Sequence, residues 1–121
     1  MQLGDLSAFP LSDEELIVVL SNLLDNAFNA CMAVSSFEER KVLLKMRTEE
    51  AAGFLYLENR TAHDVEILDN KIVAPKNKSI EHGYGLKNVA AILENINALY
   101  VFDYNSQKHL FSFSAQFPIS R

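Results

Sequence analysis

Three asparagines in the segment Leu20–Ala30, LSNLLDNAFNA, have the type and spacing of a set of metal or phosphate ligands. Asn22, Asn26 and Asn29 are separated by four and then three residues, so on a helix they lie on one face. Asparagine is a mediocre residue for a helix interior, because its amide competes for backbone hydrogen bonds. These side chains therefore form either a solvated helix face or a set of neutral oxygen ligands for a hard cation and its phosphates.

One long helix is predicted to carry these asparagines, from the N-cap Ser12 to about Val34. Ser12 followed by Glu15 is the pattern of a capping box, in which each side chain bonds the other residue's backbone N–H. The residues Ile17, Val18 and Val19 make the first turns apolar all round, which suggests that something covers the second side as well. An apolar stripe stands roughly opposite the asparagines: Leu16, Leu20, Leu23, Leu24, Ala27, Phe28 and Cys31.

Two hairpins and a second helix are predicted for the rest of the chain. Lys41–Thr48 alternates apolar and charged residues and Ala52–Glu58 is a continuous apolar run, so the two are expected to pair antiparallel. Leu99–Tyr104 and His109–Phe117 are expected to close the chain as a second hairpin. This order predicts an α+β fold in a single domain, residues 1–121. We expect a two-layer sandwich with both helices on one face of a mixed, mostly antiparallel sheet.

The connection Asn59–Glu81 has no apolar periodicity and is predicted to lack helices and strands of its own. Connections of this length are usually functional lids or disordered segments. Its second half, Asn70–Ile80 (NKIVAPKNKSI), has no acid and three lysines: Lys71, Lys76 and Lys78. The pattern fits either a mobile loop that meets an anionic ligand or a solvated surface loop, and the sequence leaves both interpretations open.

Two glycines stand in the segment His82–Leu86 (HGYGL), directly before a helix that is predicted to end near Asn97. Gly83 and Gly85 would let backbone amides approach a phosphate at the helix N-terminus, where the dipole favours an anion. By itself, a pair of glycines at this spacing usually indicates only a turn. Lys87 is expected in the first helical turn, where a cation opposes the dipole unless an anion lies nearby.

Length and composition limit the class of protein. A chain of 121 residues that is 49% apolar and 22% charged is typical of one globular domain. The net charge of −5 argues against a nucleic-acid binder, which would present a basic face. The single cysteine, Cys31, excludes an internal disulfide framework and fits a reducing compartment. We see no signal-peptide pattern and no apolar run as long as a membrane span, so the domain is expected to be soluble.

The two motifs in this order carry a family resemblance. NLLDNA (Asn22–Ala27), a polar connection, HGYGL at a helix start and a closing hairpin resemble the ATP-binding domain of sensor histidine kinases over Leu11–Ser120. This is the Bergerat, or GHKL, fold of gyrase, chaperone and mismatch-repair ATPases. The chain is most similar to the AgrC-type peptide quorum-sensing kinases, which pair an NLLDNA box with an HGLGL-like box.

The resemblance implies a site for ATP and Mg²⁺. Asn26 would coordinate a Mg²⁺ that bridges the phosphates, and Asn22 would bind phosphate or a metal-bound water, which makes both of them catalytic residues. Asn29 would lie at the rim of the site. Gly83 and Gly85 match the second glycine box of the family, which contacts phosphates. The other residues expected to contact the nucleotide are Lys76, Lys78, His82, Tyr84 and Leu86.

One family motif is missing. The chain has no DxGxG sequence, so it lacks the aspartate that usually binds the adenine amino group. AgrC-type kinases also lack it and carry an asparagine after the second strand, a place that Asn59 occupies here. The amide of Asn59 would accept from the adenine amino group and donate to the ring, and Asp64 is a weaker candidate. Asn97 and Ala98 stand where relatives often have glycine, which we interpret as a turn variation without functional weight.

Asn22 also indicates the type of chemistry. ATP-hydrolysing relatives resemble one another in having glutamate there to activate water, whereas an amide cannot accept a proton at neutral pH. The resemblance therefore implies a protein histidine kinase domain that presents Mg-ATP to a histidine on a separate dimerisation domain. None of His63, His82 and His109 is expected to be that acceptor. The alternative is a non-catalytic nucleotide-binding or interaction module of the same fold.

The resemblance also implies partners and a location. The expected partners are ATP, the phosphoacceptor dimerisation domain of the same protein and a response regulator, and no nucleic acid. The full-length protein is expected to be membrane-anchored and dimeric, with this domain as a monomeric unit in the cytoplasm.

Overall fold

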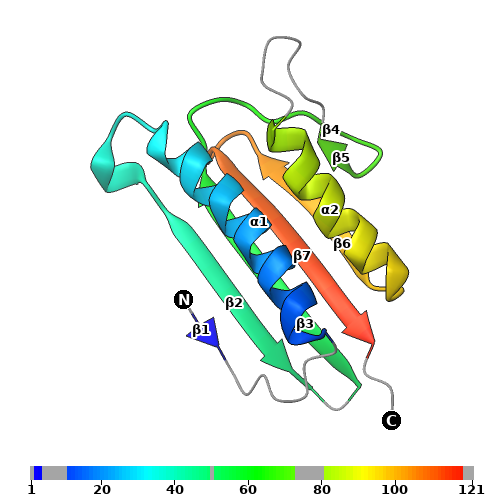
Figure 1. Cartoon of the computed structure of the whole chain (residues 1–121). Coiled ribbons are helices and arrows are strands. Elements are labelled where there is room, and N and C mark those ends of the chain that lie inside the picture. The colour runs from blue at the N-terminus through cyan, green and yellow to red at the C-terminus, as the bar shows by residue number, and fades with distance from the viewer. Residues whose placement is uncertain (1, 4–10, 50, 73–80, 119–121) are drawn as a thin grey trace.

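The structure is a computed structural model that describes residues 2–3, 11–49, 51–72 and 81–118. Within these ranges two α-helices lie on one face of a five-stranded sheet, and a small two-stranded hairpin stands beside it (Figure 1). The helices are α1 (Asp13–Met32), the short 3-10 helix η1 (Phe37–Glu39) and α2 (Glu81–Asn95). The strands are β1 (Gln2–Leu3), β2 (Val42–Thr48), β3 (Ala52–Arg60), β4 (Ile67–Leu68), β5 (Lys71–Ile72), β6 (Leu99–Asn105) and β7 (Leu110–Pro118). The predicted α+β two-layer sandwich is confirmed.

The large sheet has the strand order β1-β2-β3-β7-β6. β1 runs parallel to β2, and every other neighbouring pair is antiparallel, so the sheet is mixed and mostly antiparallel, as predicted. Both predicted hairpins form, with Met46 opposite Leu55 in the first and Phe102 opposite Phe113 in the second. The central pair, β3 with β7, brings the two hairpins together.

α1 begins as the sequence predicts, with a complete capping box. The backbone N–H of Glu15 donates to Ser12 Oγ at 3.2 Å, and the N–H of Ser12 donates to Glu15 Oε1 at 3.1 Å. The helix ends at Met32, two residues before the predicted Val34. Among the described residues, no helix combines the length and the apolar character that crossing a membrane requires.

The described elements of this chain cover only one side of the first turns of α1, so nothing in them provides the predicted cover of the second side. Val19 is fully buried, but Ile17 is 66% exposed and Val18 is exposed as well. Phe28, which belongs to the predicted apolar stripe, is also exposed. The reason is geometric, because the sheet and α2 cover one side of α1 and the apolar pattern alone does not reveal how wide that side is.

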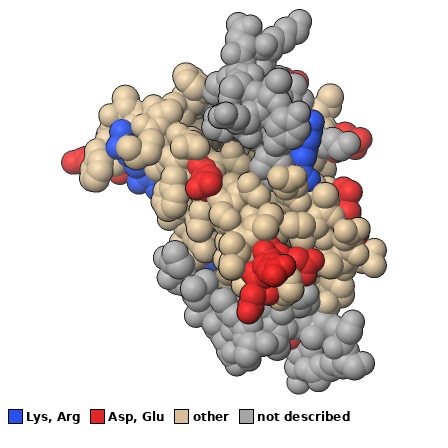
Figure 2. Space-filling view, viewed as in Figure 1, with Lys and Arg blue, Asp and Glu red and all other residues tan. Residues whose placement is uncertain are grey.

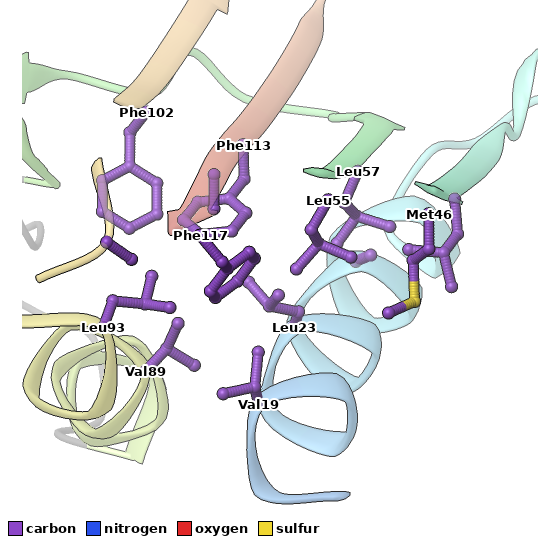
Figure 3. Packing of buried hydrophobic residues seen from close by; sticks show 14 of the residues in the cluster. Val19, Leu23, Met46, Leu55, Leu57, Val89, Leu93, Phe102, Phe113 and Phe117 are labelled. Carbon is purple, nitrogen blue, oxygen red and sulfur yellow. The ribbon is translucent and has the colours of Figure 1, made fainter. Parts of the chain in front are cut away.

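The core is one apolar layer between the two helices and the sheet (Figure 3). α1 contributes Val19 and Leu23, and α2 contributes Val89 and Leu93. The sheet side of the layer consists of alternate residues of each strand, which point to the same face. Its largest fully buried members are Leu55, Leu57, Phe113 and Phe117.

The expectation that Asn59–Glu81 lacks elements of its own was wrong for its first half. β3 continues to Arg60, and β4 and β5 form a hairpin in which Ile67 pairs with Ile72. The turn of this hairpin has both central residues in the left-handed region, Asp69 at φ 53° and Asn70 at φ 57°. These are the angles and residue types of a two-residue type I′ turn. Residues 73–80 lie outside the described part of the chain.

α2 ends in a Schellman motif centred on Asn97. Asn97 has φ 58°, the N–H of Ala98 donates to the carbonyl of Leu93 at 2.9 Å, and the N–H of Asn97 donates to Glu94 at 3.2 Å. This is the pattern of a left-handed residue one position after the C-cap. Asparagine is the residue that replaces glycine there most readily, so the interpretation of Asn97 as a turn variant has a structural basis.

We expect Asn97→Ala to lower the free energy of unfolding by about 1 kcal/mol, because alanine carries the steric cost of the left-handed conformation. Asn97→Gly should change it by less than about 0.5 kcal/mol, since glycine is the preferred residue at this position. Urea unfolding followed by circular dichroism measures both. Asn95→Ala, inside the last turn of α2, is the matched control and should not destabilise. Equal stability of Asn97→Ala and the wild type would contradict the assignment.

Candidate functional site

The residues singled out in the sequence come from three elements that meet at one end of the sandwich. The C-terminal half of α1, the end of β3 and the start of α2 all lie at the upper end of the molecule in Figure 1. α1 and β3 pack against each other, as do α1 and α2. The fold therefore brings the NLLDNA segment, Asn59 and the HGYGL segment to the same region, although they are up to about sixty residues apart in sequence.

Two of the three asparagines of α1 are half-buried. Asn22 Nδ2 donates to the carbonyl oxygen of Val18 at 2.9 Å, and Asn26 Nδ2 donates to that of Asn22 at 3.1 Å. Asn29 is exposed. Each of the two backbone bonds uses the nitrogen of a carboxamide and orients the group, so the oxygen is turned away from the helix carbonyl that the nitrogen contacts. The oxygen is the end of an amide that binds a cation.

Asn59 is the last residue of the inward-facing row of β3, after Leu55 and Leu57. Its side chain is only 2% exposed, and its Nδ2 donates to the carbonyl oxygen of Arg60 at 3.1 Å. A carboxamide thus stands in the helix-facing layer where the apolar row ends. The weaker sequence candidate, Asp64, is an exposed residue of the loop after β3.

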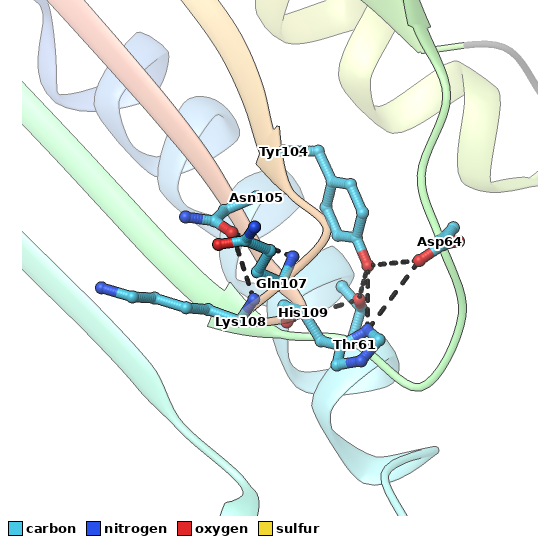
Figure 4. Close-up of polar contacts among 7 residues, drawn as sticks. All are labelled: Thr61, Asp64, Tyr104, Asn105, Gln107, Lys108 and His109. Carbon is cyan, nitrogen blue, oxygen red and sulfur yellow. Dashed lines mark hydrogen bonds and ion pairs between the residues drawn. The ribbon is translucent and has the colours of Figure 1, made fainter.

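Asp64 instead belongs to a polar cluster that sequence reasoning missed (Figure 4). Tyr104 Oη donates to Asp64 Oδ1 at 3.0 Å and accepts from Thr61 Oγ1 at 3.4 Å. His109 Nδ1 lies 3.3 Å from Tyr104 Oη and 3.8 Å from Asp64 Oδ1. Partial burial raises the pKa of Tyr104, the Thr61 hydrogen bond opposes that rise, and the Asp64 carboxylate adds to it. The cluster ties the loop after β3 to the β6–β7 hairpin, a contact between segments about forty residues apart that no local pattern reveals.

The glycine motif lies in a different place from the predicted one. α2 begins at Glu81, so Gly83 and Gly85 are inside its first turns rather than before it. Lys87 is therefore not in the first turn, and it is exposed. Glycine in a helix interior costs only about 1 kcal/mol relative to alanine. Packing of the following residues can offset this cost.

The remaining predicted contact residues fall into three groups. Leu86 is half-buried and packs against the core. His82 and Tyr84 are in the first turn of α2, and the structure describes their backbone only. Lys76 and Lys78 lie in 73–80, outside the described residues.

The donor set of this region is made of amides. Among residues 11–49, 51–72 and 81–118, no group of three or more His, Cys, Asp or Glu side chains is arranged to hold a metal ion. Mg²⁺ usually takes only one or two protein ligands and completes its shell with phosphate and water oxygens. The flank of α1 that carries Asn22 and Asn26 offers ligands of that kind.

Comparison with models of known protein families identifies the family of this chain. A family model described as "GHKL domain" matches residues 11–116. The chain belongs to the GHKL domain family. The matched segment contains the NLLDNA and HGYGL motifs and all of the site residues named above.

Solved structures include similar folds. One is the Acinetobacter baumannii histidine kinase AdeS, which is similar to this chain with a TM-score of 0.57 and 18% sequence identity. The similarity covers 89% of this chain and 47% of that chain, so this GHKL chain spans about half the length of that structure. At this level of identity the likeness concerns the fold. No curated protein matches the sequence.

We expect Asn59→Asp to lower the free energy of unfolding by about 1–3 kcal/mol at pH 7, because the buried position would hold a charge and lose its bond to Arg60. Burial raises the folded-state pKa of such an acid. The loss should therefore be complete above that pKa and vanish below the unfolded value of roughly 4, as protonation removes the charge and restores a donor. Urea unfolding between pH 3.5 and about 8 measures the effect.

The matched control is Asn105→Asp. Asn105 is exposed, and its Oδ1 accepts from the N–H groups of Gln107 and Lys108 at 3.0 and 3.1 Å. An aspartate keeps these acceptor oxygens, so the control should show little change in stability. An Asn59→Asp variant as stable as the wild type at pH 7 would contradict the buried placement of Asn59.

Proposed function

We propose that this GHKL domain binds Mg-ATP and presents its γ-phosphate to a histidine on a separate dimerisation domain, as the catalytic domain of a sensor histidine kinase. The observation that carries the proposal is the pair Asn22 and Asn26. Both are half-buried, one turn apart on α1, and oriented by backbone bonds, and α1 packs against α2. GHKL domains generally bind ATP with Mg²⁺, and this pair fits that ligand.

The chemistry of the amides fits magnesium. In the proposal Asn26 supplies an oxygen ligand to Mg²⁺, and Asn22 binds a phosphate oxygen or a metal-bound water. A carboxamide does this without adding negative charge beside a triphosphate, whereas a carboxylate would increase the repulsion. The metal would supply charge neutralisation for the phosphates. In the proposal the asparagines of α1 bind and orient the nucleotide. Their hydrogen bonds to the backbone already restrict the carboxamides, so less conformational entropy is lost on binding.

The adenine side of the site would depend on Asn59. Its amide has a hydrogen-bond donor and an acceptor, and the edge of adenine offers the complementary acceptor and donor. Asn59 is buried in the helix-facing layer, while Asp64 is exposed and held by Tyr104 and His109. We therefore assign adenine contact to Asn59 and not to Asp64.

The absence of a base at position 22 favours transfer over hydrolysis. An amide at Asn22 does not accept a proton from water at neutral pH. A neutral imidazole needs no such activation, and positioning with charge neutralisation provides most of the catalysis in phosphoryl transfer. In the proposal the acceptor histidine belongs to another domain, as the family resemblance implies, and His109 of this domain is engaged with Tyr104 and Asp64.

The wider assignment follows from the resemblance described above. We propose an AgrC-type kinase in which this domain faces the cytoplasm, the full-length protein is membrane-anchored and dimeric, and a response regulator receives the phosphoryl group. A second candidate is a non-catalytic nucleotide-binding module of the same fold. It is favoured by one observation, the absence of a DxGxG aspartate, in whose stead the chain offers a buried Asn59 that donates to the carbonyl oxygen of Arg60.

Measurement of the affinity for Mg-ATP tests the proposed nucleotide site. Calorimetric titration with ATP and a non-hydrolysable analogue should show binding that strengthens with Mg²⁺. Asn26→Ala should weaken the Mg²⁺-dependent binding at least about tenfold, because it removes the proposed metal ligand. The half-buried side chain points off the core stripe, so the thermal midpoint should fall little.

Asn29→Ala is the matched control on the same helix face and should keep most of the affinity, since Asn29 is exposed. Equal binding by wild type and Asn26→Ala with and without Mg²⁺ would rule out this magnesium site.

Phosphoryl transfer distinguishes the two candidate functions. With γ-labelled ATP and an added dimerisation-helix domain, the kinase proposal expects label on a histidine of that domain, and little steady hydrolysis by the GHKL domain alone. Binding of ATP without transfer would favour the non-catalytic module. Sustained hydrolysis by the isolated domain would contradict the role that we give to Asn22.

A further inference from the structure

β6 is an edge strand of the large sheet, next to β7 and at the end of the strand order. The outer edge of such a strand presents backbone N–H and C=O groups that can pair with a strand of another chain. In β6 this edge is flanked by large apolar side chains, because Leu99 is 72% and Val101 57% exposed. An edge of seven residues with these neighbours favours association unless something covers it.

The side chain of Asn70, in the turn of the β4–β5 hairpin, bonds to this edge. Asn70 Nδ2 donates to the carbonyl oxygen of Tyr100 at 2.8 Å, and Asn70 Oδ1 accepts from the backbone N–H of Phe102 at 2.8 Å. The C=O and the N–H that flank Val101 are the two groups that one residue of a neighbouring parallel strand would bond. The carboxamide has the same donor and acceptor as a peptide group, so Asn70 replaces a neighbouring strand at this point.

The conformation of the hairpin turn places the Asn70 side chain at the edge of β6. Asp69 and Asn70 both have positive φ, so the turn is tight, and β4 lies against β6. In Figure 1 the hairpin lies on the β6 side of the sheet, and its turn bonds the first half of β6. The segment that leads into it is held independently, because the N–H of Thr61 donates to the carbonyl oxygen of His109 at 2.9 Å and Asp64 bonds Tyr104. Asn70 therefore bonds the turn itself to the sheet, while Ile67 of β4 packs against the core.

We propose that Asn70 is a plug for the edge of β6: it holds the β4–β5 hairpin on the sheet and denies that edge to a second copy of this chain. Without the plug, two β6 strands would pair edge to edge and bury Leu99 and Val101 at the joint. The covered edge is thus a latent interface, and the position of the hairpin decides whether it is available. This inference does not depend on nucleotide binding.

The test compares Asn70→Gly with Asp69→Gly in the whole domain. Glycine accepts positive φ at both places, so both variants keep the turn, and only the first removes the two bonds to β6. In dilute protein, below the concentration at which the variant associates, hydrogen exchange should show the amide of Phe102 exchanging about tenfold faster or more in Asn70→Gly, and near the wild-type rate in Asp69→Gly. Sedimentation should show concentration-dependent association of Asn70→Gly, with wild type and Asp69→Gly monomeric.

Two further variants make the result specific. Adding Val101→Lys to Asn70→Gly should return the protein to a monomer, because like charges would meet at the joint. Asn70→Asp should lose the plug at neutral pH, where the carboxylate faces the Tyr100 carbonyl, and regain it in acid, where the protonated group donates again.

The proposal is overturned if Asn70→Gly leaves exchange at Phe102 unchanged in the dilute monomer, if that exchange rises but the variant does not associate at higher concentration, or if the wild type associates to the same extent. Association that persists with Val101→Lys would likewise exclude the β6 edge as the joint.

Discussion

One apolar layer holds this domain together, because the described helices cover the sheet on one face only. Val19 and Leu23 of α1 meet Phe113 and Phe117 across that layer. Burial of apolar surface stabilises a fold by roughly 25 cal/mol per Å². Both helices bury residues in this one layer, so the layer fixes the positions of both. The other face carries polar pairs such as Lys41 with Glu58 at 2.8 Å, and the Lys41 hydrogen bond lowers the pKa of the Glu58 carboxyl. Groups that must act together at the site therefore lie on the helix side.

The candidate site lies where this layer stops being apolar. Along β3 the inward row passes from Leu55 and Leu57 to Asn59, and on α1 the flank beside the buried face carries Asn22 and Asn26. Each of these amides bonds the backbone next to it, which allows a polar group at a covered position without an unpaired donor. A site built in this way combines a rigid frame with neutral ligands. This is a suitable environment for a metal that brings its own charged phosphates.

Asparagine serves several physical roles in this chain, and backbone geometry decides which. Asn97 ends α2 because it tolerates a left-handed conformation, and Asn70 combines that tolerance with a side chain that imitates a peptide group on β6. Asn105 accepts two backbone N–H groups in the β6–β7 turn. A residue type alone thus says little about function. The helix, strand or turn that holds it restricts the partners that its amide can reach.

The sequence by itself determined the α+β class, both hairpins, the capping box at Ser12 and Glu15, and the helix face of Asn22, Asn26 and Asn29, because periodicity and caps are local. The resemblance carried by NLLDNA and HGYGL led to the GHKL family, which the family match confirmed. Local patterns did not predict the start of α2 at Glu81, the β4–β5 hairpin, the exposure of Ile17 or the cluster around Tyr104. The β4–β5 hairpin is local, and its Asp69–Asn70 turn was a signal that sequence reasoning missed. The other features depend on contacts between distant segments: packing against the core offsets the cost of glycines in a helix, and the cluster around Tyr104 joins segments about forty residues apart.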